Sequence, residues 1–137
     1  MAEEPGSLCW DCRAEVKVVQ VPCCERGGDP VAGAVSGPFE CAGCHKMDPA
    51  FDWARSAVRY DGVAKACLRR FKYNAGSWLL EDLTDWLLAL WRVCPDTVRK
   101  ADWATCVPLY PQRERERGYN QSALLGGSLA RRIGIPF

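Results

Sequence analysis

The sequence predicts an α/β protein in which a cysteine-rich module over residues 1–50 precedes a region of mixed helices and strands over residues 51–137. Two observations support this division. Six of the nine cysteines fall within the first 44 residues, in a stretch rich in glycine and proline that holds too few apolar residues to form a core by itself. After Pro49 the composition changes, and apolar residues recur at the spacings of helices and short strands.

The overall composition is that of an ordinary globular chain. The net charge of +1 gives no global basic field, so any binding of anions must depend on local clusters. The longest apolar run, residues 86–91, is too short to span a bilayer, and the first residues do not form a signal peptide. We therefore expect a cytoplasmic protein without membrane insertion, whose cysteines bind metal rather than form disulfides.

Residues 51–62 mix aromatic and alternating polar residues, and we expect a strand or two that end at the turn Asp61-Gly62. From that turn onward, Val63, Cys67 and Phe71 recur at a spacing of four residues. This spacing predicts an amphipathic helix with its apolar side on the protein core.

A second helix is predicted over residues 78–93, with Ser77 as its N-cap and Pro95 as its stop. Residues 103–107 then indicate a short buried strand that the next proline ends. Leucine and isoleucine at four-residue spacing predict a last helix over residues 120–133.

The pattern Cys-x-x-Cys occurs intact twice in the first 44 residues. Two residues between the thiols suit a tight turn in which both sulfurs reach one Zn²⁺ at about 2.3 Å, and two such turns complete a closed, structural site. A small segment rich in glycine and proline gains much of its folding energy from such a metal. The expected zinc ligands are Cys9, Cys12, Cys41 and Cys44.

The spacing of the cysteines leaves a second ligand set open. Zinc ribbons usually have about 15–20 residues between their cysteine pairs, whereas 28 residues separate Cys12 from Cys41 and 16 separate Cys24 from Cys41. The segment that follows Cys24 looks like a pair whose second cysteine has become Gly27. His45 could also substitute as a ligand. The alternative set is Cys23, Cys24, Cys41 and Cys44.

Arginines at alternate positions, Arg113 to Arg117, follow two prolines and precede a helix start. Arginine forks pair with phosphate oxygens, and the first N–H groups of a helix add donors, so the segment is a candidate phosphate-binding loop. Asn120 and Gln121 could donate further hydrogen bonds or simply cap the helix. The alternative is a solvated loop that balances its own charge.

The segment "CVPLYPQRERERGYNQSALL" resembles the signature "VPLHP-R--RERGFNQ" of the ComF family, competence-associated proteins with a double zinc ribbon and a type I phosphoribosyltransferase domain. Other segments are similar in the same order along the chain. "LCWDCRAEV" resembles the family's CxxCR, "CERGGDP" its CxxCGxP, and "ECAGCHKMDPAFDWARSAVRYDG" its last cysteine pair with the residues that follow. "LRRFKYNAG" resembles its "LKY-G", so that the resemblance covers essentially the whole chain.

The resemblance implies a zinc-ribbon module followed by a mostly parallel α/β sheet, with residues 103–107 as the first core strand. Such enzymes bind 5-phosphoribosyl-1-pyrophosphate with Mg²⁺ and transfer the ribosyl phosphate to a nucleophile. Family members are implicated in DNA uptake, so single-stranded DNA and competence proteins are possible partners. The implied pyrophosphate or phosphate contacts are Tyr110, Arg113, Arg117, Gly118, Asn120, Gln121 and Lys72.

Three departures from the family pattern bear on function. Tyr110 stands where the family usually has histidine, and the degenerate cysteine pairs favour one zinc rather than two. These 137 residues contain no "DD--TTG" segment, which in the family holds the ribose hydroxyls and the 5′-phosphate; Asp82 and Asp85 lie on the apolar helix instead. We therefore expect an N-terminal fragment of the phosphoribosyltransferase domain that is inactive alone and leaves Trp103 and Val107 partly exposed.

A different class of function is a stand-alone zinc-ribbon adaptor that binds protein or single-stranded DNA. Two tryptophans and two arginines near the cysteine module could stack on bases and pair with phosphates. These residues are Trp10, Trp53, Arg55 and Arg59. The competing interpretation is that the aromatic rings are buried.

Overall fold

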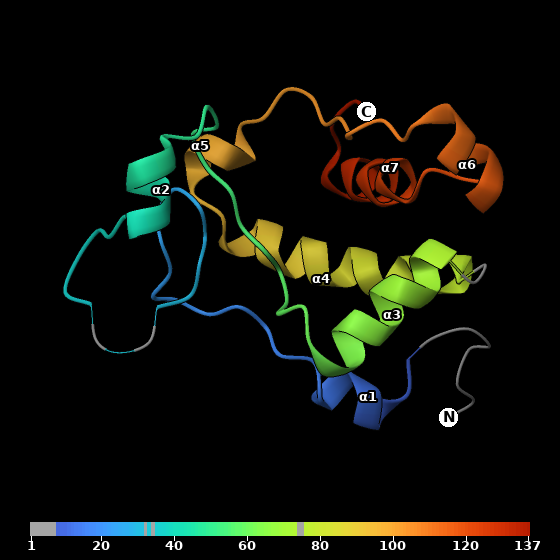
Figure 1. Cartoon of the computed structure of the whole chain (residues 1–137), viewed down its shortest axis with the longest axis horizontal. Helices are drawn as coiled ribbons and strands as arrows, with labels where there is room; N and C mark the ends of the chain where they lie inside the picture. Colours follow the sequence, from blue (N-terminus) through green and yellow to red (C-terminus); the bar gives the residue numbers. More distant parts are fainter. Residues whose placement is uncertain (1–7, 32, 34, 74–75) are drawn as a thin grey trace.

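The computed structural model of the chain describes residues 8–31, 33, 35–73 and 76–137. In Figure 1, α4 runs through the middle of the molecule, α7 lies along it, α3 lies beside its start, and α2 with the cysteine-bearing loops extends away from its other end. The helices of the described residues are α1 (Trp10–Ala14), α2 (Ala42–Met47), α3 (Gly62–Tyr73), the 3-10 turn η1 (Ser77–Leu79), α4 (Leu80–Val93), α5 (Asp96–Arg99), α6 (Pro111–Arg117) and α7 (Gln121–Ile133).

The hydrophobic core lies where α3, η1, α4 and α7 meet. Cys67, Phe71, Leu79 and Leu83 are buried there and contact one another. Burying a large apolar side chain stabilises a fold by about 1.5–3 kcal/mol, so this cluster is the main support of the helical part. Half-buried residues pack around it, namely Leu8, Val63, Leu68, Leu80, Trp86, Tyr119, Leu124 and Leu125. The predicted apolar stripe of the first long helix is confirmed by α3.

The predicted helix over residues 78–93 is confirmed, but its start differs. Ser77 is the first residue of η1 rather than the N-cap of α4, and its side chain makes no capping bond. The chain turns closely against the end of α3 here, because a Cβ at Gly76 would lie 2.8 Å from the carbonyl oxygen of Arg70. At the other end, Cys94 is extended, as is usual for a residue before proline, and α4 stops there.

The described residues contain no regular β-strand; they contain two isolated antiparallel bridges, Val18 with Val58 and Cys23 with Pro30. The prediction of a buried strand over residues 103–107 is wrong, because the described part of the chain offers these residues no neighbouring strand with which to pair. Trp103 is 73% exposed and Val107 80% exposed, so their predicted exposure is confirmed. The start of a phosphoribosyltransferase sheet is therefore not seen in the described residues.

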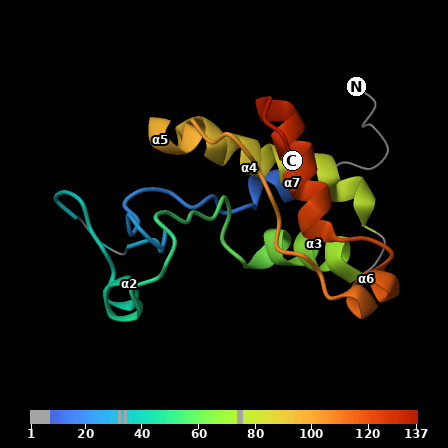
Figure 2. The ribbon, with the colours of Figure 1, turned by 90° about the horizontal axis from the view of Figure 1, so that it is seen from above.

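Residues 15–61 leave the helical part, carry the cysteine loops and α2, and return to the start of α3 (Figure 2). We call this segment the excursion. Its outgoing and returning parts are hydrogen-bonded to each other close to where they leave the helical part. Val19 N–H donates to Ala57 O at 3.1 Å, and Arg59 N–H donates to Lys17 O at 2.8 Å. The strand expected near residues 51–62 is thus reduced to one short antiparallel contact. No helix in the described part of the chain has the length and apolar character needed to cross a membrane.

Candidate functional site

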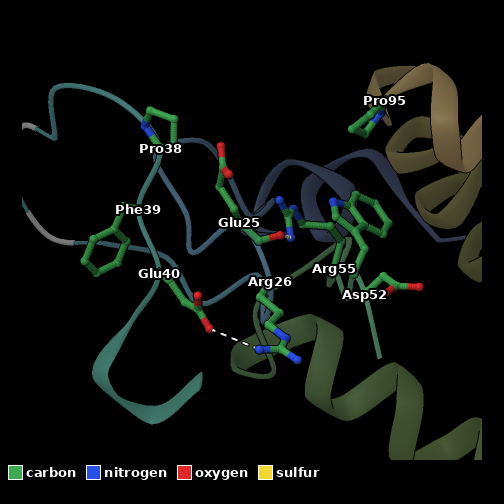
Figure 3. Close-up of a pocket in the computed structure, with 9 residues that line it drawn as sticks. Glu25, Arg26, Pro38, Phe39, Glu40, Asp52, Arg55 and Pro95 are labelled. Atoms are coloured by element: carbon green, nitrogen blue, oxygen red, sulfur yellow. Dashed lines mark hydrogen bonds and ion pairs between the residues drawn. The ribbon is translucent and has the colours of Figure 1, made fainter. Parts of the chain in front are cut away.

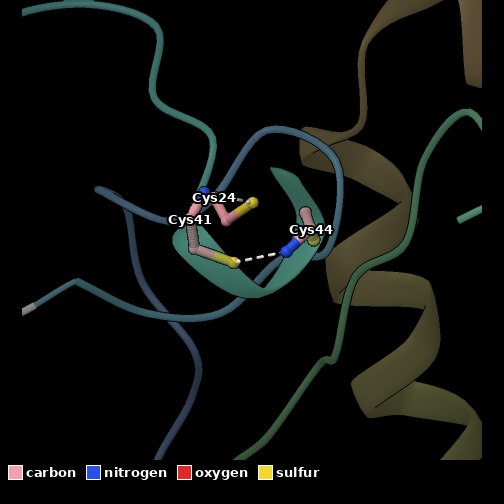
Figure 4. A group of neighbouring side chains, drawn as sticks. All are labelled: Cys24, Cys41 and Cys44. Carbon is pink, nitrogen blue, oxygen red and sulfur yellow. Dashed lines mark hydrogen bonds between the residues drawn. The ribbon is translucent and has the colours of Figure 1, made fainter. Parts of the chain in front are cut away.

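Three cysteines from two separate segments come together at the far end of the excursion. The sulfurs of Cys24, Cys41 and Cys44 all lie within 4.8 Å of one another (Figure 4). Cys24 and Cys44 are buried, and Cys41 is partly exposed. Cys41 is the N-cap of α2 and Cys44 lies in its first turn, so the helix fixes the spacing of this pair.

Backbone N–H groups point at the sulfurs of this cluster. Gly27 N–H and Cys41 N–H each donate to Cys24 Sγ at 3.3 Å, and Cys44 N–H donates to Cys41 Sγ at 3.5 Å. The bonds from Cys41 and Gly27 favour the thiolate and lower the pKa of Cys24 to about 6, although burial opposes this shift. Burial raises the pKa of Cys44 to about 12, because water does not reach its thiolate to stabilise the negative charge.

The three sulfurs fit zinc. Sulfurs that bind one tetrahedral Zn²⁺ at about 2.3 Å are about 3.8 Å apart, so a small contraction of the cluster is sufficient. Gly27 lies beside the cluster: a Cβ built on it would be 3.9 Å from Cys24 Sγ but only 2.6 Å from Cys44 Sγ, so a side chain there would require Cys44 to shift. This position agrees with the interpretation of Gly27 as a lost cysteine. A structural metal is therefore compatible with Cys24, Cys41 and Cys44 as they stand.

The structure brings Cys41 and Cys44 together with Cys24, which belongs to the second ligand set that the cysteine spacing left open. Cys12 lies on α1 and Cys9 is its N-cap residue; α1 lies beside the helical part of the molecule and away from α2 (Figure 1). Cys23 is adjacent to Cys24, but it is paired with Pro30 in an antiparallel bridge and lies outside the cluster of three sulfurs.

A buried carboxylate accounts for the position of α1. Asp82 on α4 accepts a bond from Leu8 N–H at 3.1 Å and from Arg13 Nη2 at 2.7 Å. Asp82 is only 4% exposed, whereas Arg13 is 44% exposed. These bonds hold the first cysteine pair against α4, and no spacing in the sequence indicated them. Asp85, on the exposed side of α4, pairs with Arg132 of α7.

The predicted arginine loop is a helix, α6, and the prediction of a loop is wrong. Pro111 begins α6 at a position that suits proline, and Gly118, with φ of 81°, ends it in the left-handed conformation. Arg113 is exposed on this helix, and Tyr110 precedes it as the N-cap residue. Proline is compatible with both a loop and the first turn of a helix, and here it begins the helix.

Arg117 is held by two neighbouring side chains. Its guanidinium donates to Gln121 Oε1 at 2.9 Å and to Tyr73 OH at 3.3 Å, and it lies 4.7 Å from the centre of the Tyr73 ring. Tyr73 is the last residue of α3, and the half-buried Lys72 precedes it. The end of α6 is thus placed against the end of α3, which brings basic residues from both helices into one region.

Asn120 has a structural role at the start of α7. Its Oδ1 accepts bonds from Ser122 N–H at 3.0 Å and Ala123 N–H at 3.2 Å, which is the arrangement of an N-cap. Tyr119 packs its ring on Phe71, with 5.8 Å between ring centres, and its hydroxyl donates to the Phe71 carbonyl oxygen. The alternative in which Asn120 caps the helix is thus confirmed.

A pocket of about 560 Å³ lies between the cysteine loops and Pro95 (Figure 3). Arg55 stacks over Trp53, 4.5 Å from the ring centre, and donates to Glu25 O at 2.7 Å. Arg26 pairs with Glu40 at 3.5 Å in the same pocket. The carboxylates of Glu25, Glu40 and Asp52 line its wall, which disfavours a polyanion at this place.

Comparison with known proteins supports the resemblance noted from the sequence. The chain is similar to Competence protein F of Haemophilus influenzae (strain ATCC 51907 / DSM 11121 / KW20 / Rd), with 28% identity over 133 residues. The resemblance to the ComF family is confirmed. The matched residues are 96% of this chain and 56% of Competence protein F, so the chain spans about half the length of that relative. No protein-family model and no solved structure matches the chain.

Proposed function

We propose that these residues are the zinc-bearing N-terminal part of a ComF-like phosphoribosyltransferase. One observation carries the proposal: the cluster of Cys24, Cys41 and Cys44 lies in a chain that is similar to Competence protein F along almost all of its length. The zinc would be structural, because it would tie the segment around residue 24 to α2 across loops without a core of their own. A cytoplasmic location, where thiols stay reduced, belongs to the same proposal.

Metal analysis of cysteine variants tests the zinc site. We expect the purified chain to contain one zinc per molecule and the variant Cys24→Ser or Cys44→Ser to lose it. The matched control is the double variant Cys9→Ser/Cys12→Ser, which removes two thiols at α1 where each test variant removes one. If the control loses zinc and Cys24→Ser keeps it, the proposed metal site is wrong.

The transferase activity is proposed for the complete protein. The resemblance assigns the binding of 5-phosphoribosyl-1-pyrophosphate and Mg²⁺ to the whole domain, and Arg113, Arg117 and Lys72 are candidate contacts to the pyrophosphate. Arg117 is already fixed by Gln121 and Tyr73, as a group that must meet an anion in one orientation would be. These 137 residues lack the Asp-Asp and Thr-Thr-Gly segment, so we propose that they are inactive alone.

An assay of pyrophosphate release from 5-phosphoribosyl-1-pyrophosphate separates the two cases. Residues 1–137 are compared with a chimaera in which they are joined to the remaining part of Competence protein F. We expect turnover from the chimaera only, and its loss in the variant Arg117→Ala, with Arg131→Ala of α7 as a control that changes charge equally. Turnover by residues 1–137 at the level of the chimaera contradicts the proposed inactivity.

A further inference from the structure

The three sulfurs leave a zinc ion one ligand short, and the structure offers a group to complete it. A closed structural site has four protein ligands, yet Cys24, Cys41 and Cys44 are the described residues whose sulfurs converge. Position 27, where the spacing places the missing thiol, is glycine. The fourth ligand must come from elsewhere in the chain or from water.

Asp29 is held next to the cluster by its own backbone. Cys24 N–H donates to Asp29 O at 2.8 Å, and Gly28 N–H donates to Cys24 O at 2.9 Å, so the turn from residue 24 to residue 29 closes on itself. Gly28 has a φ of 73°, and a Cβ there would lie 2.5 Å from Ala54 O, so glycine is required at the tightest point of this turn. The turn that carries Cys24 thus also carries a carboxylate.

The Asp29 side chain reaches toward the sulfur of the second segment. Asp29 Oδ2 lies 3.9 Å from Cys41 Sγ. In a tetrahedral site with a zinc–sulfur bond of about 2.3 Å and a zinc–oxygen bond of about 2.1 Å, the sulfur and oxygen ligands are about 3.6 Å apart. The observed separation from Cys41 is therefore close to that of two ligands on one ion, although Asp29 does not lie within 4.8 Å of all three sulfurs. Binding of one ion by all four groups requires a rotation of the Asp29 side chain, which is exposed.

The other groups nearby are less well placed. Glu40 is paired with Arg26 at 3.5 Å. Cys23 forms the antiparallel bridge with Pro30 and lies outside the cluster, and His45 is exposed on α2. Among the described residues, none of these side chains is hydrogen-bonded to a cluster sulfur, whereas Asp29 is.

We infer that Asp29 is the fourth zinc ligand, so that this chain holds zinc by three thiolates and one carboxylate. The inference rests on the proposed zinc site and names the ligand that replaces the thiol missing at Gly27. Because an oxygen ligand binds zinc less strongly than a thiolate in such sites, the metal is expected to exchange more readily than from four sulfurs.

X-ray absorption of the zinc-loaded full chain, and the visible spectrum of its cobalt form, count the sulfur ligands directly. We expect three sulfurs and one oxygen. The variant Asp29→Asn should lower the zinc affinity, measured by competition with a chelator, by at least about tenfold. The control Glu25→Gln removes the same charge from the same turn and should leave the affinity unchanged.

A rescue variant keeps the test independent of folding defects. The variant Asp29→Cys, which puts a thiolate in place of the carboxylate, should keep zinc tightly bound and change the count to four sulfurs. Four sulfurs in the unmodified chain, a histidine signature from His45, or an Asp29→Asn affinity equal to that of the unmodified chain each overturns the inference while leaving the zinc site in place. A chain that binds no zinc, or that keeps it in Cys24→Ser, refutes the proposed site itself.

Discussion

The bond between Arg13 and Asp82 can be tested by a double-mutant cycle. In Arg13→Ala, the Asp82 carboxylate, which is 4% exposed, keeps only the bond from Leu8 N–H. Leaving a fully buried charge without its partner lowers the free energy of unfolding by about 3–5 kcal/mol. A solvent-exposed ion pair, in contrast, contributes about 0–1 kcal/mol. Because Arg13 is 44% exposed, water reaches one side of the pair, and we place the loss at about 2 kcal/mol between these limits.

The assay is urea unfolding followed by tryptophan fluorescence, for the unmodified chain, Arg13→Ala, Asp82→Asn and the double variant. A loss of about 2 kcal/mol lowers the folding equilibrium constant by a factor of about 30. We expect the two single changes to be coupled by more than 1 kcal/mol, since each removes one charge of the same ion pair. Effects that add within about 0.5 kcal/mol would show that the two side chains act independently and that α1 is held by something else.

Three further outcomes are expected. Phe71→Ala should cost about 3–5 kcal/mol in urea unfolding because Phe71 is fully buried in the core, whereas Phe137→Ala, at a side chain that is 51% exposed, should cost clearly less. Asn120→Ala should cost about 1 kcal/mol and speed hydrogen exchange in the first turn of α7, while Asn120→Asp, which keeps an accepting oxygen, should not. With the pKa of Cys24 near 6, its thiol is already ionised at pH 7, but below about pH 6 zinc binding must also displace its proton. The apparent zinc affinity in chelator competition should therefore fall more steeply below pH 6 than above it, and an equal slope on both sides of pH 6 would contradict this role of Cys24.

The long helices could be predicted from the sequence because their cause is local. The stripe of Val63, Cys67 and Phe71 fixes which side of α3 is buried, whatever packs against it. The cap at Asn120 and the stop before Pro95 are equally local, since each depends on a side chain or ring acting on its own backbone neighbours.

The failures concern contacts between distant residues. A Cys-x-x-Cys pair shows that two sulfurs converge, but it does not show which other sulfurs they meet. Here α1 is tied to Asp82, 69 residues from Arg13, so that Cys9 and Cys12 stay near α4. Residues 103–107 have a strand-like composition, but a strand requires a partner, and in the described residues Ala104 N–H bonds to Pro136 O instead.

The candidate metal site was partly predictable. The 16-residue spacing from Cys24 to Cys41 and the glycine at position 27 both pointed to the cluster that the structure contains. Asp29 carried no such signal, because its nearness to Cys41 depends on the closed turn that begins at Cys24. An aspartate within a cysteine turn is visible in a sequence, but the direction of its side chain is not.

The antiparallel contact of Val18 with Val58 sets where the metal-binding segment leaves and rejoins the helical part. Because its two ends are hydrogen-bonded to each other, the segment from residue 19 to residue 57 is a closed loop. The entropic cost of closing such a loop grows only slowly with its length. Loss of the metal should then unfold this loop only as far as the contact of Val18 with Val58. Chelation of the metal or oxidation of the thiols would therefore disturb the segments around Cys24, Cys41 and Cys44. The helices, and the arginines that they position, would stay folded.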